Sequence, residues 1–464
     1  MDTHTLPLES KKILEECPRL RILVVGKSGV GKSSLIYSTF GVDMASVSHD
    51  APGVCDINTE ITSTQNSLFV VHDSMGFEPG QTENFEIVKH FLESRSGDKV
   101  PVKDRVHVIW HCIQVPHAGG RTSETGDENF LKLASVQKVP VVVVFTQFDM
   151  LVERMEQDLL EKMTPDEDID RLALEKADSE FHRLCLEPLR KASPGVRYAR
   201  TTGLADRSLS RSSRRSLMHL IQITRELVEE NVDGDVWIVS VMAQRANALE
   251  KINGSIEIGL KRYWQNLASA ASFGNSTLET CLATIHEEIT ESWNFYDPSD
   301  LLNGKEFRDR IKAFVQLVTP GKSEVRSWFE NLENIETLVG LGTALASVMA
   351  PAIAGIALSV VFIRWLTNAY RKTPEVLRCL MGYIIDLTLV MDQLFLIVLA
   401  IRPPRALTVD DIDLALEEYK RLDLGNVHRE VRLYANKATF AQILQANNAE
   451  QKVKELIQRF RVKS

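Results

Sequence analysis

The sequence predicts a doubly wound α/β domain with a mostly parallel sheet, followed by an all-α domain. Three observations lead to this prediction. Short β-rich runs alternate with helical stretches from Arg21 to about Ala205, a glycine-rich turn joins the first run to a helix, and no strand series follows Asp235. Such alternation is typical of α/β folds. With 464 residues, the chain is long enough for two or three domains.

Five runs are the candidate strands of the sheet. The third and fourth are nearly continuous apolar runs, as expected of parallel strands that are covered on both faces. In chain order the runs are "RILVV" (21–25), "SLFVVHD" (67–73), "VHVIWHCI" (106–113), "PVVVVFTQ" (140–147) and "VRYART" (196–201). We therefore expect helices on both sides of the sheet.

We expect three segments along the chain: a lead-in at 1–20, the α/β domain at 21–234 and a helical domain at 235–464. A charged stretch at about 151–191 has apolar residues at helical spacing and a break at Pro165, which predicts a helical insert in the α/β domain. The helix "SLMHLIQITRELVEEN" is expected to close that domain.

The composition is that of a globular protein, with 44% hydrophobic and 25% charged residues and a net charge of −9. A mildly acidic chain argues against nucleic-acid binding, which needs a basic surface, so we expect no nucleic-acid partner. The six cysteines form no CxxC pair and no zinc-ligand spacing, and no signal-peptide pattern begins the sequence. We therefore expect reduced thiols and a cytoplasmic location.

The glycine-rich turn "GKSGVGKS" (26–33) fits the pattern GxxxxGK[ST], with an apolar strand before it and a helix behind it. Gly26 and Gly31 allow a tight turn whose amide N–H groups converge on phosphate oxygens. Lys32 is expected to reach the β- and γ-phosphates, and the Ser33 hydroxyl to bind Mg²⁺. The residues expected at the phosphates are Gly26, Lys27, Ser28, Gly29, Val30, Gly31, Lys32, Ser33 and Ser34. The alternative, a turn that holds no ligand, is disfavoured by this context.

The stretch "VVHDSMG" ends the second run with the pattern DxxG. Asp73 is expected to hold Mg²⁺ through water, and the Gly76 amide to sense the γ-phosphate. The pattern alone is weak, since any aspartate that ends a strand before a turn produces it. Its position after the phosphate loop strengthens the prediction, and Lys32 and Gly76 become the expected catalytic groups.

The stretch "VVVVFTQFD" ends the fourth run and resembles the guanine motif [NT]KxD, with glutamine in place of lysine. The Asp149 carboxylate can accept from guanine N1–H and from the exocyclic amine. Adenine offers no such pair, and an unpaired buried carboxylate costs about 1–3 kcal/mol or more. Thr146 and Gln147 complete this motif, and Thr202 and Gly203 in "YARTTGL" are the expected base lid. The alternative for Asp149 is a solvated cap of the next helix.

These motifs resemble the septin-like and immunity-associated branch of the TRAFAC-class P-loop GTPases. "VVVVFTQFDML" is similar to the "FTxxDxL" of that branch, and "GGRTSETGDENFLKL" to its stretch of an arginine with acidic residues. More closely, the chain resembles uncharacterised fungal G-domain proteins in "HDSMGFEPG", in "VFTQFD" and in the "YW…CL…WNF" stretch of the helical half. The resemblance implies a G domain that binds GTP or GDP with Mg²⁺.

Three departures from related GTPases change the expected chemistry. Phe77 follows DxxG where Ras-like enzymes have the glutamine that orients water, so we expect slow intrinsic hydrolysis. Gly29 stands where related potassium-activated GTPases have asparagine, so we expect no potassium requirement. Cys55 stands where the related "PGTT" has threonine, which leaves Thr59 as the nearest candidate for the switch I threonine and Mg²⁺ ligand, with two further threonines behind it.

Arg121 in the "AGGR" loop has two interpretations. As an arginine finger toward a second subunit it would be catalytic and would imply a GTP-dependent homodimer through the G domain. We favour a solvent-facing arginine or a salt-bridge partner, because exposed arginines are common.

Two apolar runs in the helical half raise the question of a membrane. Residues 338–363 carry no charge and are long enough to cross a bilayer, while 380–401 contain Asp386 and Asp392. A two-span hairpin would put a basic connecting segment on the far side and two aspartates in the bilayer, both of which are unfavourable. We favour a helical domain with buried apolar helices. A single span at 338–363 is the alternative.

As a whole, the sequence predicts a guanine-nucleotide switch that binds GTP or GDP with Mg²⁺ and hydrolyses GTP slowly. Its helical half would couple the nucleotide state to a partner or a membrane surface. One alternative is a membrane-associated effector or remodelling GTPase anchored through 338–363. Another is a nucleotide-binding scaffold that does not hydrolyse GTP, for which Phe77 is the argument.

Overall fold

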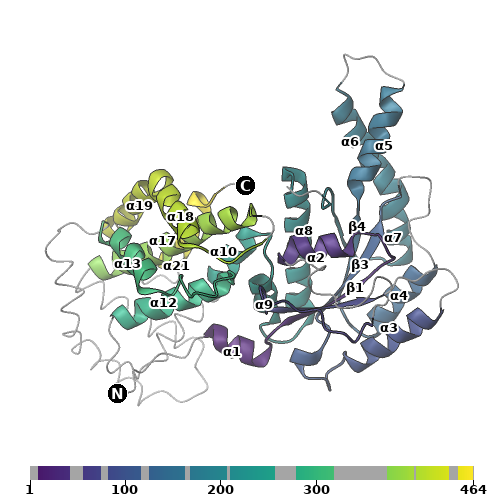
Figure 1. Cartoon of the computed structure of the whole chain (residues 1–464), viewed down its shortest axis with the longest axis horizontal. Coiled ribbons are helices and arrows are strands. Elements are labelled where there is room, and N and C mark those ends of the chain that lie inside the picture. Colours follow the sequence, from purple (N-terminus) through teal and green to yellow (C-terminus); the bar gives the residue numbers. More distant parts are fainter. Residues whose placement is uncertain are drawn as a thin grey trace. The chain divides into compact units, whose positions relative to one another are not determined.

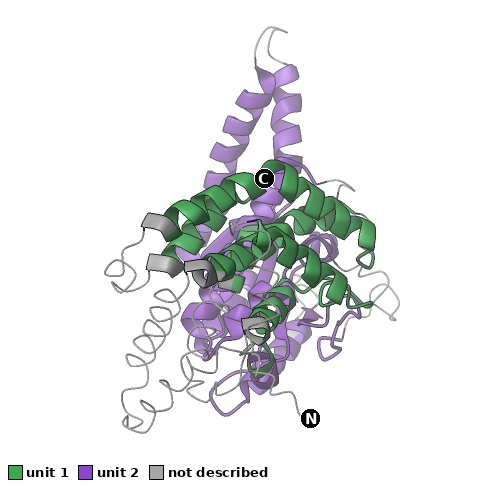
Figure 2. Ribbon diagram, turned by 90° about the vertical axis from the view of Figure 1, so that its left-hand side faces the viewer, with its two compact units in different colours: residues 1–12, 248–464 green, residues 13–247 purple. Residues whose placement is uncertain are grey.

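The computed structural model divides the chain into two compact units, which are coloured separately in Figure 2. Residues 13–247 form the α/β unit, and residues 1–12 together with 248–464 form the helical unit. The structure describes residues 9–41, 56–74, 82–116, 125–161, 168–205, 209–256, 278–317, 374–401, 404–437 and 448–462.

A five-stranded sheet forms the centre of the α/β unit, with the strand order β2-β1-β3-β4-β5 and every neighbouring pair parallel. The strands are β1 (Leu20–Val25), β2 (Phe69–Ser74), β3 (Val108–Gln114), β4 (Val141–Thr146) and β5 (Arg197–Arg200). Each predicted run supplies one of these strands, so the predicted α/β fold is confirmed. Because β1 lies between β2 and β3, the strand order reverses there, which is where ligands bind in such sheets.

Helices cover both faces of the sheet: α3 (Thr82–Ser94) and α4 (Thr125–Val136) lie on one face, and α2 (Lys32–Phe40), α8 (Arg211–Asn231) and α9 (Val236–Ala243) on the other (Figure 1). Neighbouring residues of β3 show the alternation. Ile109 packs in the core beneath α3 and α4, whereas the Trp110 Nε1 donates to Thr224 Oγ1 of α8 (3.1 Å). The covering of both faces agrees with the continuous apolar strands of the sequence.

The predicted helical insert is a hairpin of two helices, α5 (Phe148–Leu160) and α6 (Ile169–Phe181), which lie side by side and project beyond the sheet (Figure 1). A π-helical turn (His182–Leu186) and α7 (Glu187–Ala192) return the chain to β5. Phe181 packs the base of the hairpin against β4. Its ring contacts those of Phe145 and Phe148 edge-on, at centroid distances of 5.2 and 5.7 Å.

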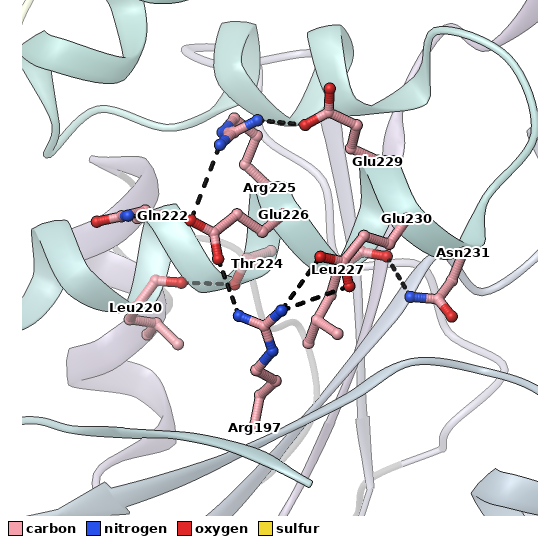
Figure 3. Close-up of polar contacts among 10 residues, drawn as sticks. All are labelled: Arg197, Leu220, Gln222, Thr224, Arg225, Glu226, Leu227, Glu229, Glu230 and Asn231. Carbon is pink, nitrogen blue, oxygen red and sulfur yellow. Dashed lines mark hydrogen bonds and ion pairs between the residues drawn. The ribbon is translucent and has the colours of Figure 1, made fainter. Parts of the chain in front are cut away.

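A group of ion pairs joins α8 to β5 (Figure 3). Arg197 Nη1 donates to Glu226 Oε2 (3.0 Å) and Arg197 Nη2 to Glu230 Oε1 (3.1 Å), while Arg225 pairs with Glu229 along the helix. These side chains are partly exposed, so each pair contributes little free energy. The buried apolar face of α8 therefore supplies most of the stabilisation here.

The described elements of the helical unit are helices, with α17 packed against each of α10, α12, α13, α18, α19 and α21. Their bounds are α10 (Ala248–Ile256), α12 (Leu278–Trp293), α13 (Lys305–Gln316), α17 (Pro374–Leu399), α18 (Val409–Leu422), α19 (Leu424–Lys437) and α21 (Asn448–Phe460). The first residues of α1 (Glu9–Glu16) also belong to this unit, and Ser10 Oγ donates to Glu291 of α12 (2.6 Å). A capping box between Thr408 and Asp411 begins α18.

Two aspartates of α17 are buried and hydrogen-bonded. Asp386 accepts hydrogen bonds from Tyr419 Oη (2.5 Å) and His428 Nε2 (2.9 Å), and Asp392 accepts one from the Val462 backbone N (2.8 Å). A buried carboxylate is costly unless it is hydrogen-bonded. These contacts allow a mostly apolar helix to carry two carboxyl groups in the core of the helical unit.

The structure describes only one of the two apolar runs of the helical half. Residues 338–363 lie outside the described residues, while 380–401 coincide with most of α17. Within the described part of the chain, Met381–Leu399 is the one helix long and apolar enough to cross a membrane, and 78% of that window is buried inside the protein. This burial agrees with the favoured interpretation of 380–401 as a core helix.

Buried histidines in both units give the fold a predicted pH dependence. Burial lowers the pKa of His72 and His107 in the α/β unit, and of His286 in the helical unit, to about 4. The unfolded chain takes up these protons near pH 6.5, so acid stabilises the unfolded state before it protonates the folded one. We expect the free energy of unfolding to fall by about 2 kcal/mol per histidine between pH 7 and pH 5, measured by urea denaturation.

The matched variants are His286→Gln and His90→Gln. The first should remove its share of the pH dependence, because glutamine does not titrate. The second changes a side chain that is 76% exposed and should leave the dependence unchanged. Equal free energies of unfolding for the wild-type chain at the two pH values would contradict the prediction.

Candidate functional site

The phosphate loop predicted at 26–33 lies between β1 and α2, at the point where the strand order reverses. Gly29 (φ 78°) and Gly31 (φ 92°) adopt the left-handed conformation, which glycine takes without strain. Among the described residues, no side chain caps the N-terminus of α2, which follows Gly31. The helix start and the glycine turns therefore offer backbone N–H groups to an anion.

Gly26 sets how closely the loop approaches the sheet. A Cβ at this position would lie 2.5 Å from the Cys112 carbonyl oxygen of β3 and 3.2 Å from Val30 Cγ2. Real Cβ atoms do not approach a backbone oxygen so closely, so only glycine allows this packing. Val30 is buried beneath the loop, whereas Ser28, Gly29 and Ser33 are exposed on its outer side.

Lys32 and Asp73, predicted from separate motifs, lie together. Lys32 Nζ donates to the carbonyl oxygen of Gly26 (2.6 Å) and lies 3.5 Å from Asp73 Oδ1 at the end of β2. Burial raises the pKa of the Asp73 carboxyl, and the neighbouring ammonium opposes that rise. The Lys32 side chain therefore bonds to the phosphate loop itself and lies next to Asp73, the other residue predicted to act at the phosphates.

The donor set suits Mg²⁺ better than a metal held by protein ligands alone. In the part of the chain that the structure describes, no group of three or more His, Cys, Asp or Glu side chains could hold a metal ion. Mg²⁺ is commonly bound by one or two protein oxygens together with phosphates and water. Ser33 at the start of α2 and Asp73 at the end of β2 supply oxygens of that kind.

The predicted base-reading residues also meet. Asp149, in the first turn of α5, accepts a hydrogen bond from the Gly203 backbone N (2.8 Å). The loop after β5 is held beside β4, because Thr201 N donates to the Phe145 carbonyl (2.7 Å). The structure therefore brings Thr146–Asp149 together with Thr202 and Gly203 at the carboxyl edge of the sheet.

Gln147 joins this region to the phosphate loop. Its backbone is left-handed (φ 57°), its Nε2 donates to the Gly29 carbonyl oxygen (2.9 Å), and its Oε1 accepts from Gln114 Nε2 (2.7 Å). Gln114 carries no signal in the sequence, because a glutamine at the end of a strand belongs to no nucleotide motif.

Arg200 is a second residue that the sequence did not indicate. Its guanidinium lies 3.7 Å from the centroid of the Phe148 ring, and Nη1 donates to Asp178 of α6 (2.5 Å). Stacking of this kind contributes about 0.5–1 kcal/mol at exposed sites. Arg200 therefore fixes the residue between Gln147 and Asp149 against the inserted hairpin.

Thr59 lies in an exposed turn, where its backbone N donates to the Asp56 carbonyl (2.9 Å). The segment is tied to β2: His72 Nδ1 lies 2.7 Å from the Ile57 carbonyl oxygen, and an antiparallel bridge joins Ile61 to Val71. Burial lowers the pKa of His72 to about 4, so its neutral ring donates this bond from Nδ1.

Four residues to which the sequence assigned a role lie outside the described residues: Gly76, Phe77, Cys55 and Arg121. Their predicted roles in γ-phosphate sensing, water positioning, switch I and dimerisation stay predictions.

Two families match parts of the chain. Residues 21–147 match the family described as 50S ribosome-binding GTPase, and residues 301–464 match a domain of unknown function (DUF8505). The first match covers β1 to Gln147 and so includes the phosphate loop, Asp73 and the start of the guanine motif. The second lies within the helical unit.

Two curated relatives are similar to part of the chain. GTPase Der from Mesoplasma florum is 28% identical over 160 residues, which cover 34% of this chain and 34% of that protein. Translocase of chloroplast 90, chloroplastic, from Arabidopsis thaliana is 36% identical over 109 residues, which cover 22% of this chain and 14% of that protein. The chain thus spans about a third or less of the length of these relatives.

Two solved structures of Era are similar at 16% identity, each covering 51% of this chain and 66% of the other. One is Era in complex with MgGDPNP and nucleotides of 16S ribosomal RNA (TM-score 0.26), and the other is an Aquifex aeolicus Era variant bound to GDP.AlF4- (TM-score 0.24). Because these scores are low, the class of the domain rests on the family match and on the site. Together they identify a P-loop GTPase domain, and the family match within it spans residues 21–147.

Gly26→Ala tests the close approach of the phosphate loop to β3. We expect it to lower the free energy of unfolding by about 1–3 kcal/mol, because a methyl group at this position overlaps backbone that cannot move aside. Gly425→Ala in the first turn of α19 is the control, where the open space around the added methyl group predicts no loss of stability. Thermal unfolding of the nucleotide-free chain measures both, and a Gly26→Ala variant as stable as wild type would contradict the packing.

Proposed function

We propose that the protein is a guanine-nucleotide switch, and one observation carries this proposal. The phosphate loop with Lys32 and the Asp149–Gly203 pair lie at the carboxyl edge of one parallel sheet and are joined by the bond from Gln147 to Gly29. A phosphate cradle and a base-reading carboxylate at one edge are what a nucleoside triphosphate site requires.

At the phosphate end, residues 26–34 would hold the nucleotide through backbone N–H groups, and Lys32 would leave the Gly26 carbonyl to bind the β- and γ-phosphates. Ser33 and Asp73, with Thr59 as the switch I candidate, would hold Mg²⁺, which neutralises phosphate charge when bound. Gly76 would sense the γ-phosphate through its amide. These roles are supported by the short distance between Lys32 Nζ and Asp73 Oδ1.

At the base end, Asp149 would select guanine. Its carboxylate accepts two hydrogen bonds from N1–H and the exocyclic amine of guanine, whereas the N1 of adenine is itself an acceptor. Thr146 and Gln147 would support this contact, and Thr202 and Gly203 would cover the base. The support for this role is the hydrogen bond that the Asp149 carboxylate accepts from the Gly203 backbone N, because it holds Asp149 beside the proposed base lid.

The proposal also includes the rate of GTP hydrolysis, the coupling of the nucleotide state to the helical unit, and the location of the protein. The sequence places Phe77 after DxxG, which supports slow GTP hydrolysis, and Arg121 would act only if a second G domain met the first. The helical unit would transmit the nucleotide state to a partner, or to a membrane surface if 338–363 inserts. The septin-like and immunity-associated branch, a cytoplasmic location and the absence of a nucleic-acid partner complete the proposal, the last supported by the net charge of −9.

Calorimetry with GDP, GTP and ATP in Mg²⁺ tests nucleotide choice on the full chain. We expect heat from both guanine nucleotides and none from ATP. Asp149→Asn should weaken GTP binding by about 10- to 100-fold and favour the xanthosine nucleotide, because the amide replaces an acceptor with a donor. Asp158→Asn, farther along α5, is the control and should bind GTP as wild type does. An Asp149→Asn variant with unchanged GTP affinity would show that another residue reads the base.

Single-turnover phosphate release tests the proposed rate. We expect intrinsic hydrolysis on the order of 10⁻³ per second or slower, as for GTPases without a supplied arginine. Phe77→Gln should raise the rate, because an amide can orient the attacking water and a phenyl ring cannot. Rapid hydrolysis by the wild-type chain would contradict this part of the proposal, and its complete absence in both variants would favour the scaffold alternative.

A further inference from the structure

The Gln147 side chain has two polar ends, and each has a different partner. Nε2 donates to the Gly29 carbonyl oxygen (2.9 Å), while Oε1 accepts from Gln114 Nε2 (2.7 Å). Gln114 is the last residue of β3, where it pairs in register with Thr146, the residue before Gln147. Two amides thus form a chain from the edge of the sheet to the phosphate loop.

The orientation of both amides follows from one backbone group. A carbonyl oxygen can only accept, so Gln147 must present Nε2 to Gly29. Its Oε1 is then left facing Gln114, which must present Nε2 in turn. Reversing either amide would place two acceptors or two donors together. The carbonyl group of Gly29 in the phosphate loop therefore sets the orientation of both glutamine amides.

The guanine motif that "TQFD" resembles has lysine at this position, and the difference is chemical. An ammonium group has three donors and no acceptor, so it can bond to a carbonyl without a partner that orients it. An amide has one donating and one accepting end, so the end that faces Gly29 depends on what the other end meets. Gln114 presents a donor there.

We propose that Gln114 is a positioning residue for the nucleotide site, which orients the Gln147 amide that ties the base-reading segment to the phosphate loop. The inference rests on the proposed guanine-nucleotide function. Gln147 lies two residues before Asp149, and its left-handed backbone leaves little freedom to compensate for a misplaced side chain. Misorientation of the amide therefore shifts both ends of the nucleotide site.

Gln114→Glu is the sharpest test, because it keeps the size of the side chain and replaces the donor with acceptors. To pair with it, the Gln147 amide must turn, which places its oxygen against the Gly29 carbonyl. We expect the Kd for GDP, measured by displacement of a fluorescent guanine nucleotide from the full chain, to rise about 3- to 10-fold. In a Gln147→Lys background the same change should leave the Kd unchanged or lower it, because an ammonium can donate to both groups.

A second double-mutant cycle, with methionine at both positions, tests the same coupling if the Gln147→Lys variant does not bind nucleotide. Gln114→Met should raise the Kd in the wild-type chain and have no effect in a Gln147→Met background, where the accepting end is already absent. Gln137→Glu is the matched control: its Oε1 accepts from Ser96 Oγ (2.9 Å), a role that a carboxylate retains, so GDP binding should be unchanged. Melting temperatures of the nucleotide-free variants separate binding from folding.

The outcomes distinguish this inference from the function on which it rests. A wild-type chain that binds no guanine nucleotide refutes both. A wild-type chain that binds GDP, with a Gln114→Glu variant of equal affinity, refutes only the positioning role. Equal losses in the wild-type and Gln147-substituted backgrounds would show that Gln114 acts through another group, which overturns the proposal. A purely structural role would not depend on the residue at position 147.

Discussion

The parallel direction of all five strands is the constraint on which the site depends. Because parallel strands end at the same edge, residues scattered over more than half of the α/β unit are collected there. In strand order across the sheet, the contributions are Asp73 from β2, Lys32 beyond β1, Gln114 from β3, Gln147 and Asp149 beyond β4, and Gly203 beyond β5. The phosphate loop follows the strand at which the order reverses, so it lies between the groups that would hold the metal and those that would read the base.

Close packing gives this edge its geometry. Gly26 allows the loop to lie directly on the β3 backbone, and the Gln147 amide bridges from the end of β4 to the outer side of the same loop. The inserted hairpin begins at Phe148, and its base packs against the sheet edge because Phe181 and Arg200 contact the Phe148 ring. The hairpin therefore begins within the segment that is predicted to read the base.

The helical unit is organised by burial of one apolar helix. α17 is apolar around most of its circumference and must be covered on all sides, and among the described helices six others pack against it. Its two aspartates are accepted in the core because Tyr419, His428 and the Val462 backbone N supply hydrogen bonds. The same sequence would be read as a membrane span from length and composition alone, so the cover of protein decides its environment within the described part of the chain.

The sequence by itself determined the five strands, the helical insert and the glycine-rich turn, because hydrophobic periodicity and turn residues are local properties of the chain. It also indicated Lys32, Asp73 and Asp149, since each ends or follows a strand in a recognisable pattern. Only the tertiary structure decided which of these residues meet, that Gly26 touches Cys112, and that Gln114 and Arg200 contact the segment predicted to read the base. Those contacts join residues distant in sequence, and their partners carry no motif, so they follow from strand order and packing, which no local pattern encodes.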